Sequence, residues 1–148
     1  MPKKTIETFF KEEEKEAIVE AIKRAEKNTS GEVRVHIESK CKGSELSRAA
    51  QVFKILGMHK TKQRNGVLIY LAFKDRKFAV IGDAGINEVV PEDFWEEIKV
   101  LLLNRFAERK FGKGIASAID KIGEKLAEFF PYQTDDVNEL PDEISFGA

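Results

Sequence analysis

Residues 67–73 (Val-Leu-Ile-Tyr-Leu-Ala-Phe) are apolar at every position and rich in β-branched and aromatic side chains. A strand of this composition is buried on both of its faces, so it lies at the centre of a sheet that is covered on both sides. The polar residues 74–77 then predict a turn, and the apolar residues 78–81 predict an antiparallel partner strand. Any fold for this chain must therefore supply two layers that shield the central strand from water.

The preceding segment predicts a second, parallel strand. Residues 32–38 alternate strictly between polar and apolar side chains, which indicates a strand with one covered face. Ser44 then suits the N-cap of a helix. The apolar stripe of that helix comprises Leu46, Ala49, Ala50, Phe53 and Leu56. This helix would connect the first strand to residues 67–73 as a right-handed βαβ crossover, so these two strands should be parallel.

Further helices are predicted where apolar residues recur at helical spacing. These helices cover residues 12–27, the segment that follows Pro91 as far as Phe106, and residues 115–130. The glycines in residues 111–114 are expected to separate the last two helices. About four helices then flank a small mixed sheet, and helices on both faces of a buried sheet give an α/β fold, a three-layer α/β/α sandwich.

The length of 148 residues suits one domain that needs neither disulfides nor a metal for folding. We assign residues 1–131 to this domain. Residues 132–148 form an acidic C-terminal tail, since no basic residue follows Lys125, and the apolar residues of the tail are expected to dock on the domain. These apolar residues are Leu140, Pro141, Ile144 and Phe146.

Charge and hydropathy argue against several kinds of partner. The chain has 25 Lys and Arg residues and 26 Asp and Glu residues, so no nucleic acid partner is expected. No segment reaches the ~18 uninterrupted apolar residues of a membrane span, and the N-terminus lacks the apolar core of a signal peptide.

The single cysteine, Cys41, has no partner within the chain, which fits a reducing compartment. We therefore expect a cytoplasmic monomer without a membrane span.

Acidic residues gather at one end of the predicted sheet. Asp83 lies in the turn formed by residues 82–85, and Glu32 begins the first strand and opens on the same side. Glu88 and Asp93 follow Asp83 across a short loop. Carboxylates that meet here would bind Ca²⁺ or Mg²⁺, which are hard cations that prefer oxygen ligands. The structural alternative makes Asp83 a turn former and Glu88 and Asp93 favourable charges at a helix start.

Other polar positions also carry a functional and a structural interpretation. Arg64 either presents its guanidinium to a phosphate or belongs to the turn that feeds the buried strand. His36 either exchanges protons near neutral pH or is a histidine at the surface or between layers. Cys41 is interpreted as an incidental loop thiol, because the sequence offers it neither a resolving cysteine nor a histidine base. No pair of nucleophile and general base is recognisable in the sequence.

Several segments together resemble the TPM domain family. They are residues 25–33, which include Thr-Ser-Gly-Glu, residues 64–69 (Arg-Asn-Gly-Val-Leu-Ile), residues 81–86 (Ile-Gly-Asp-Ala-Gly-Ile) and residues 106–114. The family includes thylakoid-lumen and photosystem-repair proteins, a nematode receptor modulator and many bacterial proteins. The resemblance extends over about residues 9–131, and its specificity comes from the ordered set of segments.

The resemblance implies an α/β/α sandwich, an acid phosphatase activity of the kind reported for plant relatives, and divalent-cation binding at an acidic cluster. The matching positions here are Glu32 and Asp83, with Glu88 and Asp93 as their neighbours. Many relatives have a signal peptide and a membrane helix, whereas neither is expected from the sequence of this chain. Residues 82–85 also stand where many relatives have a glycine-aromatic-glycine turn.

Two functions stay open at this point. In the first, the chain is a metal-assisted phosphatase, a hydrolase that acts weakly on a phosphorylated small molecule. A Ca²⁺ or Mg²⁺ ion held by Asp83, Glu88 and Glu32 would polarise a phosphoryl oxygen and activate water, and Arg64 would steady the charge. Asp83 and Arg64 are thus the candidate catalytic residues. In the second, the chain is a non-enzymatic module that binds a protein partner and holds a structural metal or none.

Overall fold

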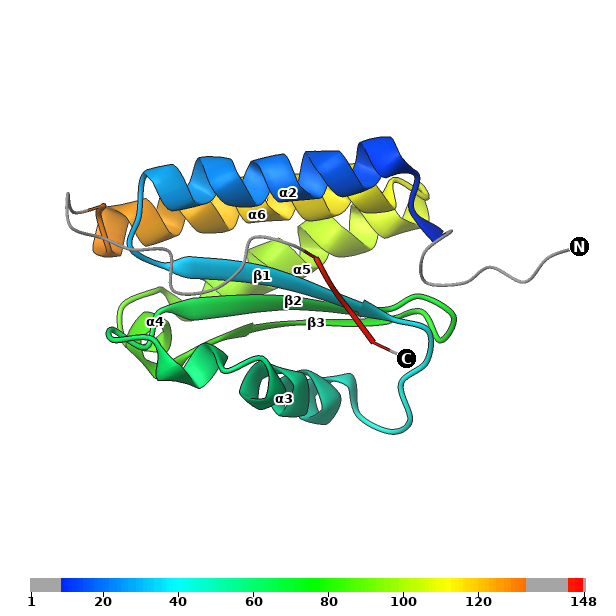
Figure 1. The fold of residues 1–148 in the computed structure, drawn as a ribbon, viewed down its shortest axis with the longest axis horizontal. Coiled ribbons are helices and arrows are strands. Elements are labelled where there is room, and N and C mark those ends of the chain that lie inside the picture. The colour runs from blue at the N-terminus through cyan, green and yellow to red at the C-terminus, as the bar shows by residue number, and fades with distance from the viewer. Residues whose placement is uncertain (1–8, 133–143, 148) are drawn as a thin grey trace, which may run out of the picture.

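The computed structural model describes residues 9–132 and 144–147 of the chain. Within them the sheet has the strand order β3-β2-β1-β4 (Figure 1). The strands are β1 (Glu32–Glu38), β2 (Gly66–Ala72), β3 (Lys77–Gly82) and β4 (Ser145–Phe146). β1 and β2 are parallel, and β2 and β3 are antiparallel. This arrangement confirms the predicted crossover and the predicted return strand.

Helices cover both faces of the sheet, which confirms the three-layer sandwich (Figure 1). They are α2 (Glu12–Lys27), α3 (Glu45–Ile55), the 3-10 helix η1 (Met58–Lys60), α4 (Ala84–Asn87), α5 (Glu92–Ala107) and α6 (Phe111–Phe129). α2, α5 and α6 lie on one face, with α2 and α6 side by side, and α3 lies on the other face. In the part of the chain that the structure describes, no helix is long and apolar enough to cross a membrane.

Every residue of β2 is buried, as the apolar sequence of this strand predicts. Successive residues of a strand point to opposite faces, so the side chains of β2 enter two separate cores. Val67, Ile69 and Leu71 join the core under α2, α5 and α6, and the intervening residues join the core under α3. The central strand thereby connects the two layers of helices.

β1 is buried on both faces, whereas its alternating sequence predicted a single covered face. Glu32, His36 and Glu38 are only 3%, 5% and 3% exposed. The polar face is covered by α3, whose Arg48 contacts Glu38, and Ser145 of the neighbouring strand β4 contacts His36. The alternation of residues within one strand does not reveal which distant segments will cover its polar face. The prediction of a half-covered strand is therefore wrong.

The helix α3 follows its predicted N-cap and packs through part of the predicted stripe, namely Ala49, Phe53 and Leu56. The Ser44 hydroxyl accepts a hydrogen bond from Ser47 N at 3.4 Å, which confirms the predicted cap. Leu46 and Ala50 of the predicted stripe are exposed, and Val52 is buried instead. α3 is therefore rotated about its axis relative to the apolar stripe inferred from sequence.

The helix α6 begins at Phe111, so the glycines of residues 111–114 lie inside a helix and do not separate two helices. A Cβ on Gly112 would lie 2.7 Å from the Cβ of Glu14, which indicates that this glycine permits a close approach of α2. The chain turns instead at Arg109, which adopts a left-handed φ of 61°. The predicted start of the last helix at residue 115 is therefore wrong.

Residues 144–147 return to the sheet. β4 pairs with β1 in parallel, and Ile144 is 9% exposed. At the start of the tail, Tyr132 N donates a hydrogen bond to Asn28 O at 3.2 Å. The predicted tail residues Leu140 and Pro141 lie outside the described residues.

The variant Gly123→Ala tests the contact between α2 and α6. A Cβ on Gly123 would lie 2.7 Å from the Cβ of Ala25, which is closer than real side chains pack. Alanine favours helix formation by about 1 kcal/mol relative to glycine. We expect the overpacking to dominate and to lower the free energy of unfolding by about 1–3 kcal/mol in urea denaturation.

The matched control for this experiment is Glu124→Ala, because Glu124 is the exposed neighbour on the same helix. Its free energy of unfolding should change by no more than about 0.5 kcal/mol. If Gly123→Ala were more stable than the wild type, the close contact between the two helices would be contradicted.

Candidate functional site

Two groups of polar side chains lie at opposite ends of β1 and β2. We call the first the Asp83 edge, and it contains Glu32, Arg64 and Asp83. We call the second the Glu38 cluster, and it contains His36, Glu38, Arg48, Tyr70 and Ser145. The first lies where the sequence predicts an acidic site, whereas the second was not predicted from the sequence.

Arg64 and Asp83 form a bidentate ion pair. Arg64 Nε donates to Asp83 Oδ2 at 2.7 Å, and Arg64 Nη2 donates to Asp83 Oδ1 at 2.8 Å. Asp83 is 7% exposed, whereas 51% of the Arg64 side chain is exposed. The carboxylate is therefore buried at the end of the sheet, and the guanidinium approaches it from the solvent side.

The local backbone brings these two side chains together. Asp83 is the N-cap of the short helix α4, and its Oδ1 also accepts a hydrogen bond from Ala84 N at 2.7 Å. Gly85 N donates to Arg64 O at 2.9 Å. A Cβ on Gly85 would lie 2.1 Å from Gln63 O, so this approach of α4 to the loop before β2 requires glycine.

The contacts of Asp83 set its charge. Burial alone would raise the pKa of Asp83, but hydrogen bonds from Arg64 and from the Ala84 N–H outweigh burial and lower the pKa. The hydrogen bond to Asp83 raises the pKa of Arg64 in turn. At neutral pH the Asp83 carboxylate is therefore anionic, and the cationic guanidinium of Arg64 lies on its solvent side.

Glu32 lies in the same row of the sheet as Asp83. Glu32 is paired with Gly66 across β1 and β2, and Asp83 N donates to Gly66 O at 3.0 Å. Neighbouring residues of one row point to the same face, so the side chains of Glu32 and Asp83 lie on the α3 face with Gly66 between them. Met58 lies over Gly66, where a Cβ would be 3.3 Å from Met58 O. The topology thus places two buried carboxyl side chains on one face at this end of the sheet.

The other predicted ligands lie on the following elements. Glu88 is the C-cap of α4, Asp93 lies in the first turn of α5, and both residues are exposed. Across residues 9–132 and 144–147, no group of three His, Cys, Asp or Glu side chains is arranged to hold a metal ion. The metal-ligand roles of Glu32, Asp83, Glu88 and Asp93 stay predictions.

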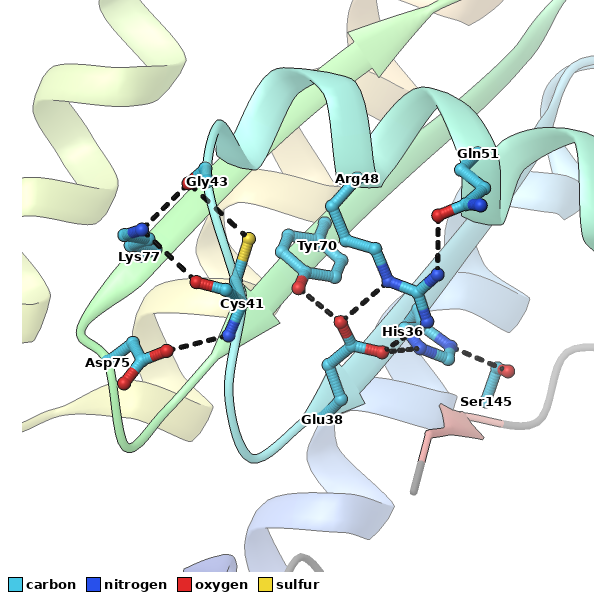
Figure 2. Close-up of polar contacts among 10 residues, drawn as sticks. All are labelled: His36, Glu38, Cys41, Gly43, Arg48, Gln51, Tyr70, Asp75, Lys77 and Ser145. Carbon is cyan, nitrogen blue, oxygen red and sulfur yellow. Dashed lines mark hydrogen bonds and ion pairs between the residues drawn. The ribbon is translucent and has the colours of Figure 1, made fainter.

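Glu38 lies at the centre of the Glu38 cluster (Figure 2). Arg48 of α3 donates from Nε to Glu38 Oε2 and from Nη2 to Glu38 Oε1, both at 2.9 Å. Tyr70 of β2 donates its hydroxyl to Oε2, and His36 Nε2 lies 3.1 Å from Oε1. Ser145 Oγ of β4 lies 2.9 Å from His36 Nδ1. The cluster thus joins three strands of the sheet to α3.

Burial and hydrogen bonding both change the pKa values of the groups in the cluster, and for Glu38 and His36 they act in opposite directions. Burial alone would raise the pKa of Glu38, but hydrogen bonds from Arg48, Tyr70 and His36 lower it to about 2. Burial raises the pKa of Tyr70, and its hydrogen bond to Glu38 raises it further. Burial lowers the pKa of His36 despite the opposing effect of Glu38. The polar groups pair with one another, so the cluster fixes α3 to the sheet and contacts β4 through Ser145.

A neighbouring set of contacts anchors the loop after β1 (Figure 2). Cys41 N donates to Asp75 Oδ2 at 2.7 Å. Lys77 Nζ donates to Cys41 O at 3.1 Å and to Gly43 O at 2.7 Å. Cys41 is 3% exposed, so the thiol that the sequence placed in a loop belongs to the core under α3.

Tyr70 is the residue from which the Glu38 cluster could have been predicted in the sequence. It is the single hydroxyl in the apolar run 67–73, and a buried tyrosine hydroxyl usually has a hydrogen-bond partner. His36 of β1 pairs with Tyr70 of β2, so the parallel crossover brings the polar positions of β1 beside it. The polar face of β1 was therefore the place to look for that partner.

A family model and a solved structure both match most of this chain. A sequence model of the family described as the TPM domain matches residues 5–125. The chain is also similar to the BA42 protein from the psychrophilic bacterium Bizionia argentinensis, whose NMR structure is 47% identical in sequence, with a TM-score of 0.89. That match covers 97% of this chain and 99% of the other. No match was found among curated proteins.

The variant Glu38→Gln tests the cluster through the pH dependence of stability. A carboxyl group whose pKa is lower in the folded state stabilises the fold above its unfolded pKa, and this contribution is lost as the pH falls. For Glu38 this window runs from its ordinary value of 4.5 down to about 2. We expect Glu38→Gln to lower the free energy of unfolding at pH 7 by about 3 kcal/mol, because Arg48 loses its buried partner.

The same variant should flatten the loss of stability between pH 4.5 and pH 2. Urea denaturation at several pH values measures both effects. Glu13→Gln, which changes an exposed carboxyl group on α2, is the control and should keep the wild-type pH profile. Parallel profiles for wild type and Glu38→Gln would mean that Glu38 does not have the lowered pKa.

Proposed function

The chain belongs to the TPM domain family, and on this premise we propose that it binds a divalent cation at the Asp83 edge and has weak phosphomonoesterase activity. The proposal rests on the bidentate contact between Asp83 and Arg64. A buried, ionised carboxylate here already binds a cationic group at the surface of the protein. The guanidinium of Arg64 thus stands in for the charge that a metal ion would bring.

The residues of the Asp83 edge suit Mg²⁺ better than Ca²⁺. Mg²⁺ is commonly held by one or two carboxylates and retains several water molecules, whereas Ca²⁺ takes about 6–8 oxygen ligands. Asp83 and Glu32 would supply the two carboxylates. Glu88 and Asp93 offer further oxygen atoms from α4 and α5. A site with few protein ligands fits a cation that also contacts a phosphorylated substrate.

A divalent cation bound here would polarise a phosphoryl oxygen and lower the pKa of a bound water molecule. Asp83 and Glu32 would position the ion. Arg64 is half exposed, and its planar guanidinium can turn from Asp83 to make two parallel hydrogen bonds with a phosphoryl group. In this arrangement Arg64 neutralises the substrate, while the buried carboxylates stay attached to the sheet.

The alternative function is a non-enzymatic module that binds a protein partner. The observation in its favour is the pairing of β4 with β1, since this part of the sheet already accepts an extended segment. The two functions use opposite ends of β1, so both are compatible with one chain.

The variant Asp83→Asn tests the cation site. We expect Mg²⁺ added to metal-stripped wild-type protein to cause saturable amide shifts at residues 82–88 and at Glu32 in ¹H–¹⁵N NMR spectra. Asp83→Asn should lose these shifts, because an amide is a much poorer ligand for Mg²⁺ than a carboxylate. The control Glu92→Gln removes an exposed carboxylate at the start of α5 and should titrate like the wild type. Identical titrations of Asp83→Asn and wild type would rule out Asp83 as a ligand.

The variant Arg64→Met separates cation binding from catalysis. It removes the group that competes for Asp83, so Mg²⁺ should still bind, at an affinity equal to or above that of the wild type. Hydrolysis of p-nitrophenyl phosphate should fall by about tenfold or more, because charged hydrogen bonds to the phosphoryl group are lost. The control Lys62→Met removes the same charge from the same loop. Saturable binding of Mg²⁺ without any turnover in the wild type would contradict the phosphatase activity and leave the cation site standing.

A further inference from the structure

Residues 144–147 form a short strand at the edge of the sheet, beside the Glu38 cluster. Ser145 pairs with His36, and Phe146 pairs with Ile37. Gly147 N donates to Ile37 O at 2.8 Å, which continues the pairing by one residue. The segment is thus recognised in part through backbone hydrogen bonds, as in peptides that add a strand to an existing sheet.

Each side chain of this segment meets a different environment. Ile144 is 9% exposed and belongs to the core under α2, α5 and α6. Ser145 Oγ lies 2.9 Å from His36 Nδ1, whose ring is positioned through Nε2 by Glu38. Phe146 is 42% exposed, with Lys15 Nζ 5.9 Å from the centre of its ring.

Gly147 is held where no side chain fits. A Cβ at this position would lie 2.5 Å from Glu38 Oε1 and 2.9 Å from His36 Nε2. Both of these atoms belong to buried groups, since Arg48 holds the Glu38 carboxylate and Glu38 in turn positions the His36 ring, so they cannot easily move away. The edge of β1 therefore selects an apolar residue, a hydroxyl residue, a variable residue and a glycine, in that order.

We propose that the edge of β1 at residues 36–38 is a sequence-selective strand-docking site, which residues 144–147 occupy reversibly and which accepts the same segment from a second copy of this chain. The contact consists of one buried apolar side chain, one side-chain hydrogen bond, the approach of Lys15 to the Phe146 ring and a few backbone hydrogen bonds. These contacts must offset the entropy of ordering the segment, so the docked and released states are close in free energy.

A second copy is the natural partner because its C-terminal segment carries the required sequence. Exchange of an identical element between two copies reproduces every contact of the single chain, and it costs little when the element is short and terminal. Attachment to the same chain gives the segment a high local concentration, so exchange is favoured only at high protein concentration. The site is distinct from the Asp83 edge, and this inference does not depend on the proposed enzymatic function.

The full-length variant Gly147→Val tests the site, because its own segment no longer fits and the edge of β1 becomes accessible. The probe is a fluorescent peptide of residues 142–148 (Asp-Glu-Ile-Ser-Phe-Gly-Ala), whose binding is followed by fluorescence anisotropy. We expect saturable binding to Gly147→Val. Binding to the wild type should be weaker by about tenfold or more, because its own segment competes.

Variant peptides test the sequence preference. The peptide with Gly147→Val should bind more than about tenfold less tightly, since the added side chain overlaps buried atoms. The peptide with Ser145→Ala should lose about threefold to tenfold through the missing hydrogen bond to His36. The matched control is Phe146→Ala, which changes the exposed position and should bind within about threefold of the original.

Folding of Gly147→Val is checked by its ¹H–¹⁵N NMR spectrum, and Ile144→Asp is a second variant that disfavours docking by placing a charge in the core. If neither folded variant binds the peptide, or if the Gly147→Val peptide binds as tightly as the original, the docking site is refuted. Light scattering over a range of concentrations tests the second copy as partner. A dimer that grows with concentration in the wild type and is lost in Gly147→Val supports exchange, and a wild type that stays monomeric at millimolar concentration overturns it.

Discussion

Exclusion of water from both faces of β2 is the constraint on which the rest of the structure depends. The strand has no polar face, so one layer of helices on each side is required. α3 supplies one layer within the crossover between β1 and β2, and α2, α5 and α6 supply the other. Because the middle of the sheet is enclosed in this way, ionised side chains are accommodated at its two ends. The Asp83 edge and the Glu38 cluster are the result.

Each end of the sheet contains a carboxylate paired with an arginine, but the two pairs have different roles. Asp83 and Glu38 are both buried carboxylates, and each accepts two hydrogen bonds from one arginine. Arg64 reaches Asp83 from a loop and is half exposed, so this ion pair is open to solvent on the arginine side. Arg48 belongs to α3, and Glu38 is also bound by Tyr70 and His36, so that carboxylate is fixed. Access from solvent, more than the identity of the groups, separates a candidate binding site from a structural anchor.

Much of the fold could be predicted because local patterns and tertiary packing agree. The bounds of α2, the cap at Ser44 and the direction of β1, β2 and β3 follow from periodicity, turn residues and the handedness of crossovers. Predictions failed where contacts between distant segments decide the outcome, as at the start of α6 and the second face of β1. Topology placed Glu32 and Asp83 at one end of the sheet. Arg64, which pairs with Asp83, adopts a left-handed backbone conformation that no local pattern specified.

Cys41 makes the two cores of this protein chemically distinguishable. Its backbone is held by Asp75 and Lys77, and its thiol is enclosed under α3, while the core on the opposite face of the sheet contains no cysteine. A thiol reagent can therefore label the folded chain only when the loop that carries Cys41, or the α3 layer that covers it, opens. The labelling rate measures how often the structure around Cys41 opens, on the α3 side of the sheet. Labelling of this one native side chain thus reports on the stability of one of the two cores.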